Sequence, residues 1–189
     1  MASNSFWLHL QRAQLIMRRY VVTNGFDGAL TLLGMVAGFQ ASGATDMHVA
    51  FSACLGATVA LFISGLSSAY LSEKAERQAE LKTLEQALMI SLENTDYGRA
   101  SRYLPWMVSL ANGLAPLVLS AVILLPMGLA VQGVALPVPP LLLAMGLALI
   151  ELFLLGVFLG QISQSFWLWS GLRTLMTALV TLGVIFALG

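Results

Sequence analysis

The chain has 189 residues, of which 58 % are hydrophobic and only 10 % are charged, and its formal net charge is zero. Soluble domains average about 45–50 % apolar and about 25 % charged residues, so this composition excludes a soluble enzyme, a disordered chain and a nucleic-acid-binding protein. The single cysteine excludes a disulfide scaffold. At about 20 residues per span, the apolar residues are sufficient for about five membrane-spanning helices.

The sequence therefore predicts an all-α, polytopic membrane protein with a single membrane domain over 1–189. A basic N-terminal helix over 1–25 comes first and contains Arg12, Arg18 and Arg19. Because residues 1–25 contain no uninterrupted apolar core, we expect no cleavable signal peptide, and the segment suits a basic helix that lies on or enters the cytoplasmic membrane face. Five apolar spans follow, at 26–45, 49–70, 105–127, 140–160 and 169–188.

All basic residues lie on one side of the predicted membrane. They occur in the N-terminal arm, in a short acidic helical insert over 71–104 and at Arg173, whereas the loops near 46–48 and 128–139 have none. By the positive-inside rule the N-terminus is cytoplasmic and the C-terminus lies outside, as an odd number of spans requires. We expect a multi-pass protein of the cell membrane, or of the vacuolar membrane if the organism is eukaryotic.

Small residues at four-residue spacing predict where helices pack closely. Gly34 and Gly38 form such a pair in the first span, and Gly156 and Gly160 form another in the fourth. The second span carries a continuous small-residue ridge that consists of Ser52, Gly56, Ala60, Ser64, Ser68 and Ser72. Two interpretations of this ridge remain open: tight packing within one chain, or a homodimer seam or pore-lining face.

Two acidic residues fall within the predicted spans. Asp27 is at the start of the first span, where it is either a helix N-cap or, if the basic helix continues into the span, a carboxylate on a cation path. A carboxylate on such a path can bind a cation and a proton in alternation. Glu151 is near the middle of the fourth span, where it either carries protons or donates a neutral hydrogen bond to another helix.

Two further residues in the spans are weaker ligand candidates. Pro116 lacks an N–H, which frees the carbonyl of Asn112, so a kink lined by the Asn112 amide either coordinates an ion or is satisfied by neighbouring groups. Met35 offers a soft sulfur ligand. No Walker loop, HExxH or GxSxG motif occurs in the sequence. We therefore expect neither an enzyme nor a permanently bound cofactor.

The insert begins with a predicted helix over 71–94 in which acidic residues gather on one face. At 100° per residue, the first three acids fall within an arc of about 60°. Hard divalent cations favour oxygen ligands. The predicted metal ligands are Glu73, Glu76 and Glu80, with Glu85 as a lesser candidate. The alternative is a solvated face on which Glu73 pairs with Arg77 at i,i+4.

Four segments, in order along the chain, resemble the vacuolar iron transporter family. Arg19–Gly38, with its Asp-Gly pair and glycine-spaced apolar stretch, is similar to the family's first helix. Ser64–Arg77, with its Tyr-x-Ser and following acids, resembles the end of the second helix. Glu151–Gly156 and Trp169–Arg173 resemble the fourth helix and the entry to the fifth.

The resemblance implies a homodimer whose paired first and second helices enclose a cation path through the lipid bilayer. It implies export of Fe²⁺, and often Mn²⁺, from the cytoplasm in exchange for protons, with these divalent metal ions as substrates. It places Asp27 on the path and assigns metal capture to the acidic helix after the second span.

Two features depart from the family pattern. Gly65, Ser68 and Ala69 stand where the family commonly has a methionine and a Gly-Glu pair, and the cytoplasmic insert is short. These departures leave an alternative function, a non-transporting membrane scaffold or regulatory protein of the same fold.

Overall fold

The described residues, 2–43 and 46–188 of the computed structural model, form five helices, and side chains are described from residue 16 onward. The helices are α1 (Ala2–Ala41), α2 (Met47–Leu88), α3 (Asp96–Val131), α4 (Pro140–Ile162) and α5 (Trp167–Leu188). Each contains a segment that is long and apolar enough to cross a membrane. The prediction of an all-α fold with five such helices is confirmed, and it is consistent with an integral membrane protein.

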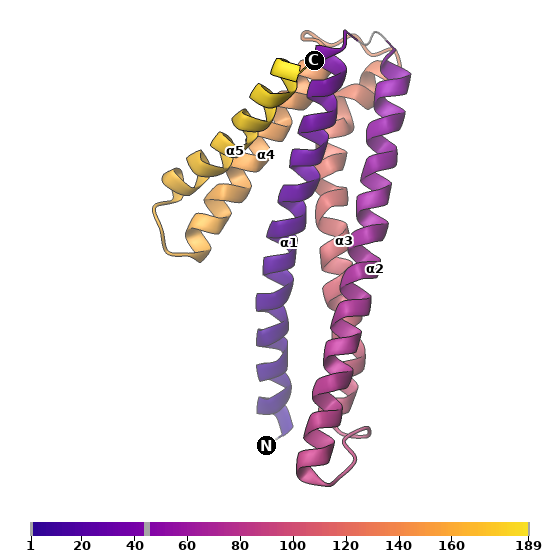
Figure 1. Ribbon diagram of the computed structural model, residues 1–189, viewed down its shortest axis with the longest axis vertical. Helices are drawn as coiled ribbons and strands as arrows, with labels where there is room; N and C mark the ends of the chain where they lie inside the picture. Colours follow the sequence, from indigo (N-terminus) through magenta and orange to yellow (C-terminus); the bar gives the residue numbers. More distant parts are fainter. Residues whose placement is uncertain (1, 44–45, 189) are drawn as a thin grey trace.

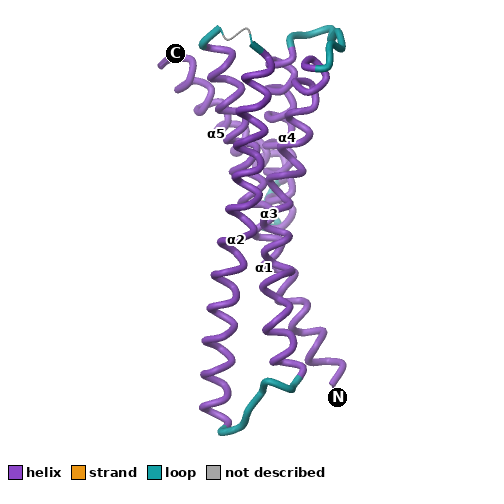
Figure 2. Tube along the Cα trace, turned by 90° about the vertical axis from the view of Figure 1, so that its right-hand side faces the viewer, coloured by secondary structure: helices purple, strands orange, loops and turns teal. Residues whose placement is uncertain are grey.

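The three longest helices, α1, α2 and α3, form one bundle, and α4 and α5 lie along one side of its upper half (Figure 1). The N-terminus and the turn between α2 and α3 are at the lower end. The C-terminus and the α1–α2 and α3–α4 connections are at the upper end (Figures 1 and 2). The N-terminal arm and the insert, which hold most basic residues, thus lie at the opposite end from the loops that have none.

The bundle is longer than a membrane is thick. At 1.5 Å per residue, the 42 residues of α2 extend about 63 Å, which is about twice the ~30 Å hydrocarbon core of a bilayer. The 23 residues of α4 extend about 35 Å, close to one membrane thickness. The lower half of α2 and the start of α3 therefore project beyond the apolar layer that α4 and α5 define, and they form the predicted insert.

The structure corrects the predicted start of the first span. α1 runs without a break from Ala2 to Ala41, because no proline interrupts it, so the basic segment 1–25 continues into the span. Asp27 therefore lies inside a helix, and its interpretation as an N-cap is wrong. Of the predicted span 26–45, the last two residues fall outside the described residues.

The insert helix also ends earlier than predicted, at Leu88 instead of 94. Met89 takes a left-handed conformation (φ 54°) that stops the helix. α3 then begins at Asp96, where the side chain of Thr95 accepts a hydrogen bond from the Gly98 N–H at 3.3 Å. Such an N-cap satisfies one of the unpaired amides of the first turn.

The core lies between α1, α3 and α4. Its largest fully buried side chains are Leu32, Leu33, Val36, Ile123, Met127 and Leu152. Glycine allows two close contacts around it. A Cβ at Gly28 would lie 2.7 Å from the Cβ of Pro116, and a Cβ at Gly156 would lie 2.8 Å from the Cα of Gly171 on α5. The predicted close packing at Gly156 is therefore confirmed.

Candidate functional site

A line of polar residues follows the outer face of α1. Its members, Arg19, Thr23, Asp27 and Thr31, are four residues apart and all are exposed. Residues at this spacing share one face of a helix. The neighbouring Gly28 is buried against α3, so this α1 polar line points away from the core.

Asp27 has an unusual position in this line. It lies inside the apolar segment Ile16–Ala41, which is a candidate membrane span, yet no ion pair to it occurs among the described side chains. A carboxylate that faces hydrocarbon is costly, and intramembrane acids normally face a partner or a water-filled path. The outer face of α1 at Asp27 is therefore unsuited to lipid.

The small-residue ridge of α2 is exposed along its whole length. α2 packs on α3 through another face, where a Cβ at Gly65 would lie 3.3 Å from the carbonyl oxygen of Asn112. A Cβ at Gly56 would meet nothing within 4 Å. The interpretation of the ridge as tight packing within one chain is therefore wrong, and the homodimer seam or pore-lining face stays a prediction.

The first-span glycines differ from each other. A Cβ at Gly34 would lie 3.7 Å from Cδ1 of Ile185 on α5, which is ordinary contact. A Cβ at Gly38 would meet nothing within 4 Å. Of this predicted packing pair, only Gly34 contacts another helix within the chain.

Bulky side chains on the ridge should disrupt self-association. We expect Gly56→Leu and Ser64→Leu each to weaken the dimer at least about tenfold, because small residues let membrane helices approach closely. Light scattering in detergent measures the oligomeric state. The matched control is Gly183→Leu on α5, where a Cβ also meets nothing within 4 Å. Dimers of normal stability and activity from both ridge variants would mean that the ridge faces lipid.

A cavity of about 350 Å³ lies at the lower end of the α1 polar line; we call it the acidic cavity after its two glutamates, which two arginines in the same wall balance in charge. Residues of α1 and α2 line it, namely Ile16, Arg19, Tyr20, Glu73, Glu76 and Arg77. Arg19 belongs both to this cavity and to the polar line. Asp27 is two helical turns above it, about 12 Å along the axis. The structure thus brings Glu73 and Glu76 together at the lower end of the α1 polar line, which includes Asp27.

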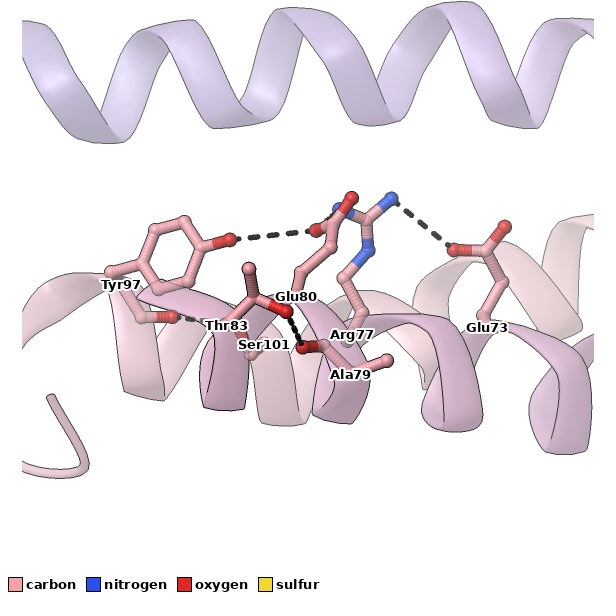
Figure 3. Close-up of polar contacts among 7 residues, drawn as sticks. All are labelled: Glu73, Arg77, Ala79, Glu80, Thr83, Tyr97 and Ser101. Atoms are coloured by element: carbon pink, nitrogen blue, oxygen red, sulfur yellow. Dashed lines mark hydrogen bonds and ion pairs between the residues drawn. The ribbon is translucent and has the colours of Figure 1, made fainter. Parts of the chain in front are cut away.

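Arg77 holds two of the predicted metal ligands (Figure 3). Its Nη2 lies 3.6 Å from Oε2 of Glu73, and its Nη1 donates to Oε2 of Glu80 at 2.6 Å. The hydroxyl of Tyr97 donates to the same Glu80 oxygen at 3.4 Å. The alternative pairing of Glu73 with Arg77 is therefore confirmed, whereas Glu76 is exposed and has no ion pair among the described residues.

Glu73 differs electrostatically from its neighbours because it is only 4 % exposed. Burial raises the pKa of its carboxyl above the usual range, and the positive charge of Arg77 opposes only part of this rise. Its Oε2 has no hydrogen-bond partner in the described part of the chain. Glu73 is therefore a buried carboxylate whose ionisation depends on a nearby cation.

Glu85 lies apart from the other acids. Its Oε1 accepts hydrogen bonds from the Leu92 N–H at 2.8 Å and from the Ser91 hydroxyl at 3.5 Å, so it closes the turn between α2 and α3. Within 16–43 and 46–188, no group of three or more His, Cys, Asp or Glu side chains is arranged to hold a metal ion.

The kink at Pro116 is satisfied by neighbouring groups. The freed carbonyl of Asn112 accepts from Nδ2 of Asn24 at 3.5 Å, and Asn24 also donates to Oδ1 of Asn112. Nδ2 of Asn112 donates to the Gly65 carbonyl at 2.7 Å. Asn112 thus ties α1, α2 and α3 together, which leaves its amide little freedom to bind an ion.

The other candidates are buried in the bundle. Met35 packs against the hydrophobic core. Glu151 is 8 % exposed, and its Oε2 has no hydrogen-bond partner among the described residues. A buried carboxyl with an unsatisfied oxygen is compatible with both predicted roles of Glu151.

The sequence is similar to an archaeal protein. It is 33 % identical over 165 residues to the uncharacterized protein MJ0645 of Methanocaldococcus jannaschii, and the match covers 85 % of this chain and 82 % of the relative. The chain belongs to the family of MJ0645. No protein-family model and no solved structure matches it.

Sequence reasoning missed two features of this member of the MJ0645 family. The i,i+4 spacing of Arg19, Thr23, Asp27 and Thr31 is visible in the sequence and could have predicted the α1 polar line. The role of Asn24 had no such signal, because its partner Asn112 is 88 positions away in the chain.

Proposed function

We propose that the protein exports divalent cations, Fe²⁺ or Mn²⁺, from the cytoplasm in exchange for protons, as its resemblance to the vacuolar iron transporter family implies. The observation that carries the proposal is Asp27, an exposed carboxylate inside an apolar helix segment, two helical turns above a cavity that contains two glutamates. Fe²⁺ and Mn²⁺ both accept carboxylate ligands.

The acidic cavity is the capture site in this proposal. Glu73 and Glu76 share it with Arg19 and Arg77, so without metal the two carboxylates are balanced by two guanidinium groups. An arriving divalent cation replaces these guanidinium groups as the counter-charge of the carboxylates. The cation then passes along the outer face of α1 to Asp27.

A homodimer completes the path. In a two-fold dimer each copy presents the same surface to the other, so two Asp27 carboxylates would approach one axis. That arrangement supplies the ligands that the described part of a single chain does not gather. Each Asp27 exchanges its cation for a proton on the outer side, and the returning proton resets the site. The small-residue ridge lets the two copies approach closely.

Proteoliposomes test the proposal. Purified protein should drive Mn²⁺ uptake that depends on an imposed proton gradient, whereas a scaffold or regulatory protein of the same fold would give no flux above empty vesicles. Mn²⁺ uptake that does not depend on the proton gradient would refute the antiport mechanism but still support a cation path.

The acidic cavity should bind metal before transport. Changing Glu73, Glu76 and Glu80 together to Gln should weaken Mn²⁺ binding at least about tenfold in calorimetry, because the capture carboxylates are lost.

The same binding should depend on pH. Since burial raises the pKa of Glu73, protons should compete with Mn²⁺ for this carboxylate at a higher pH than they would at an ordinary Glu. Affinity should thus fall as pH is lowered through that range, and less steeply in Glu73→Gln. The control Glu93→Gln removes an exposed acid outside the cavity and should bind Mn²⁺ normally. Unchanged affinity in the triple variant would mean that these acids do not capture metal and that Glu73 and Glu80 serve only as ion-pair partners of Arg77.

A further inference from the structure

A second cavity, of about 440 Å³, lies between the lower halves of α2 and α3. Its lining includes three basic residues, Lys74, Arg77 and Arg102, against one acidic residue, Glu93. Arg77 separates it from the acidic cavity, because both cavities include Arg77 in their walls. The wall of this second cavity thus has an excess of positive charge, whereas two glutamates balance two arginines in the first, so the second cavity is unsuitable for a metal cation.

The cavity lies where the apolar parts of both helices end. Tyr70 of α2 and Trp106 of α3 make a tilted ring contact in its wall, with ring centroids 4.4 Å apart and an interplanar angle of 43°. Paired aromatic residues of this kind mark the level of the lipid head groups at a membrane boundary. Lys74 is one turn further along α2 than Tyr70, so the basic residues begin at the polar edge of this level.

Two of the three cations have no carboxylate partner. Nζ of Lys74 lies 5.5 Å from the centroid of the Tyr70 ring. Arg102 donates from Nη2 to the backbone carbonyl of Glu93 at 2.9 Å. Among the side chains of 16–43 and 46–188, neither residue forms a salt bridge. Their positive charges remain available to an anion.

The third cation contributes a buried donor. The Nη atoms of Arg77 are used by Glu73 and Glu80, but its Nε is buried and has no hydrogen-bond partner in the described structure. An unsatisfied buried N–H is costly unless water or a ligand accepts from it. The wall of the cavity therefore holds two cations without a carboxylate partner, next to an arginine whose buried Nε has no hydrogen-bond partner among the described residues.

The wall of the cavity is built by a close backbone contact. A Cβ at Gly98 would lie 2.8 Å from the carbonyl oxygen of Glu93, so only glycine lets the start of α3 pack on this turn. The same carbonyl oxygen accepts the Arg102 hydrogen bond. The contact thus positions the carbonyl oxygen that holds the exposed Arg102 guanidinium at the cavity wall.

We propose that this pocket binds a phosphate group at the membrane–water boundary, with Lys74 and Arg102 as its charged ligands and the Tyr70–Trp106 pair as its apolar wall. A volume of about 440 Å³ lies within the usual range of small-ligand sites. Basic pockets between membrane helices recognise the head groups of anionic lipids, and the aromatic wall provides contact for the glycerol and first acyl carbons. The phosphate comes either from an anionic phospholipid or from soluble phosphate. The inference does not depend on cation transport.

Native mass spectrometry of the full chain in detergent tests this site. The probes are short-chain phosphatidylglycerol, phosphatidylcholine with the same acyl chains, and inorganic phosphate. Phosphatidylglycerol should bind at least about tenfold more tightly than phosphatidylcholine, and binding should weaken as salt is raised. The double variant Lys74→Gln/Arg102→Gln should lose about thirtyfold in affinity, at about five- to sixfold per cation.

The controls separate the pocket from general charge and from misfolding. Lys82→Gln/Arg99→Gln removes the same two charge types from the same two helices outside the pocket and should change affinity less than twofold. Lys74→Arg/Arg102→Lys keeps both charges and should retain binding. If the pocket and control variants lose affinity equally, or if the charge-conserving variant binds no better than the Gln variant, the proposal is overturned.

Competition between phosphatidylglycerol and inorganic phosphate identifies the source of the phosphate group. Phosphatidylglycerol binding that needs Lys74 and Arg102 and resists millimolar inorganic phosphate supports the pocket and assigns it to a lipid head group. Inorganic phosphate binding that needs the same two residues supports the pocket and assigns it to the soluble anion. If neither phosphatidylglycerol nor inorganic phosphate shows binding that depends on Lys74 and Arg102, the site is refuted.

Discussion

Replacing Asp27 with Asn should reduce Mn²⁺ flux into proteoliposomes to background while the protein stays folded and dimeric. The substitution preserves the size of the side chain and most of its hydrogen bonding but removes the charge and the exchangeable proton. Asp27 is exposed on α1 and forms no ion pair among the described side chains, so its loss leaves no buried partner unpaired. The flux assay across a proton gradient measures the effect.

Two further variants test whether the loss of flux is specific to Asp27. Asp96→Asn is the control, because Asp96 is exposed at the start of α3 and lines neither cavity, and it should transport normally. Glu151→Gln should be milder than Asp27→Asn if Glu151 is already neutral in the bundle. Normal transport by Asp27→Asn would refute the path assignment, and loss of transport in Glu151→Gln alone would move the site to α4.

The second large effect should come from the contact between α4 and α5. Gly156→Val would place a Cβ 2.8 Å from both the Gly171 Cα and the Ser170 carbonyl oxygen, and closer still to the Thr174 hydroxyl. Backbone atoms cannot move aside as a flexible side chain can, so α5 must separate from α4. We expect a loss of about 3 kcal/mol or more in the free energy of unfolding, measured by chemical denaturation in detergent.

Gly146→Val provides the comparison for this loss. Gly146 is on the same helix, and a Cβ there would meet nothing within 4 Å, so the variant should unfold within about 1 kcal/mol of the wild type. Equal destabilisation of the two variants would mean that the cost reflects valine in a helix and not the contact with α5.

The coarse fold was predictable because a membrane imposes a simple requirement, about 20 apolar residues per helix. Helix ends were harder to predict. α1 continues through its basic segment because no proline stops it, whereas α2 stops at Met89, a residue type that rarely adopts a left-handed conformation. That conformation depends on the turn that Glu85 closes, which is a contact outside local sequence patterns.

The candidate site was predictable to the extent that it is local. The helical spacing of Glu73 and Arg77 predicted their ion pair, and the structure has it. The α1 polar line was equally readable at four-residue spacing. By contrast, the cavity that joins Glu73 and Glu76 to Arg19 depends on how α1 and α2 pack, since these residues are more than 50 positions apart in the chain.

The absence of any proline from α2 gives that helix a mechanical role. Between Met47 and Leu88 the backbone is one unbroken helix. A change in the tilt or rotation of this helix at Glu73 would therefore also move the small-residue ridge, because α2 moves as one rigid body. α3 is built differently, because each of its three internal prolines, Pro105, Pro116 and Pro126, removes a backbone hydrogen bond and makes local bending cheaper. Motion between the two ends of the bundle would therefore be transmitted by α2 and absorbed by α3.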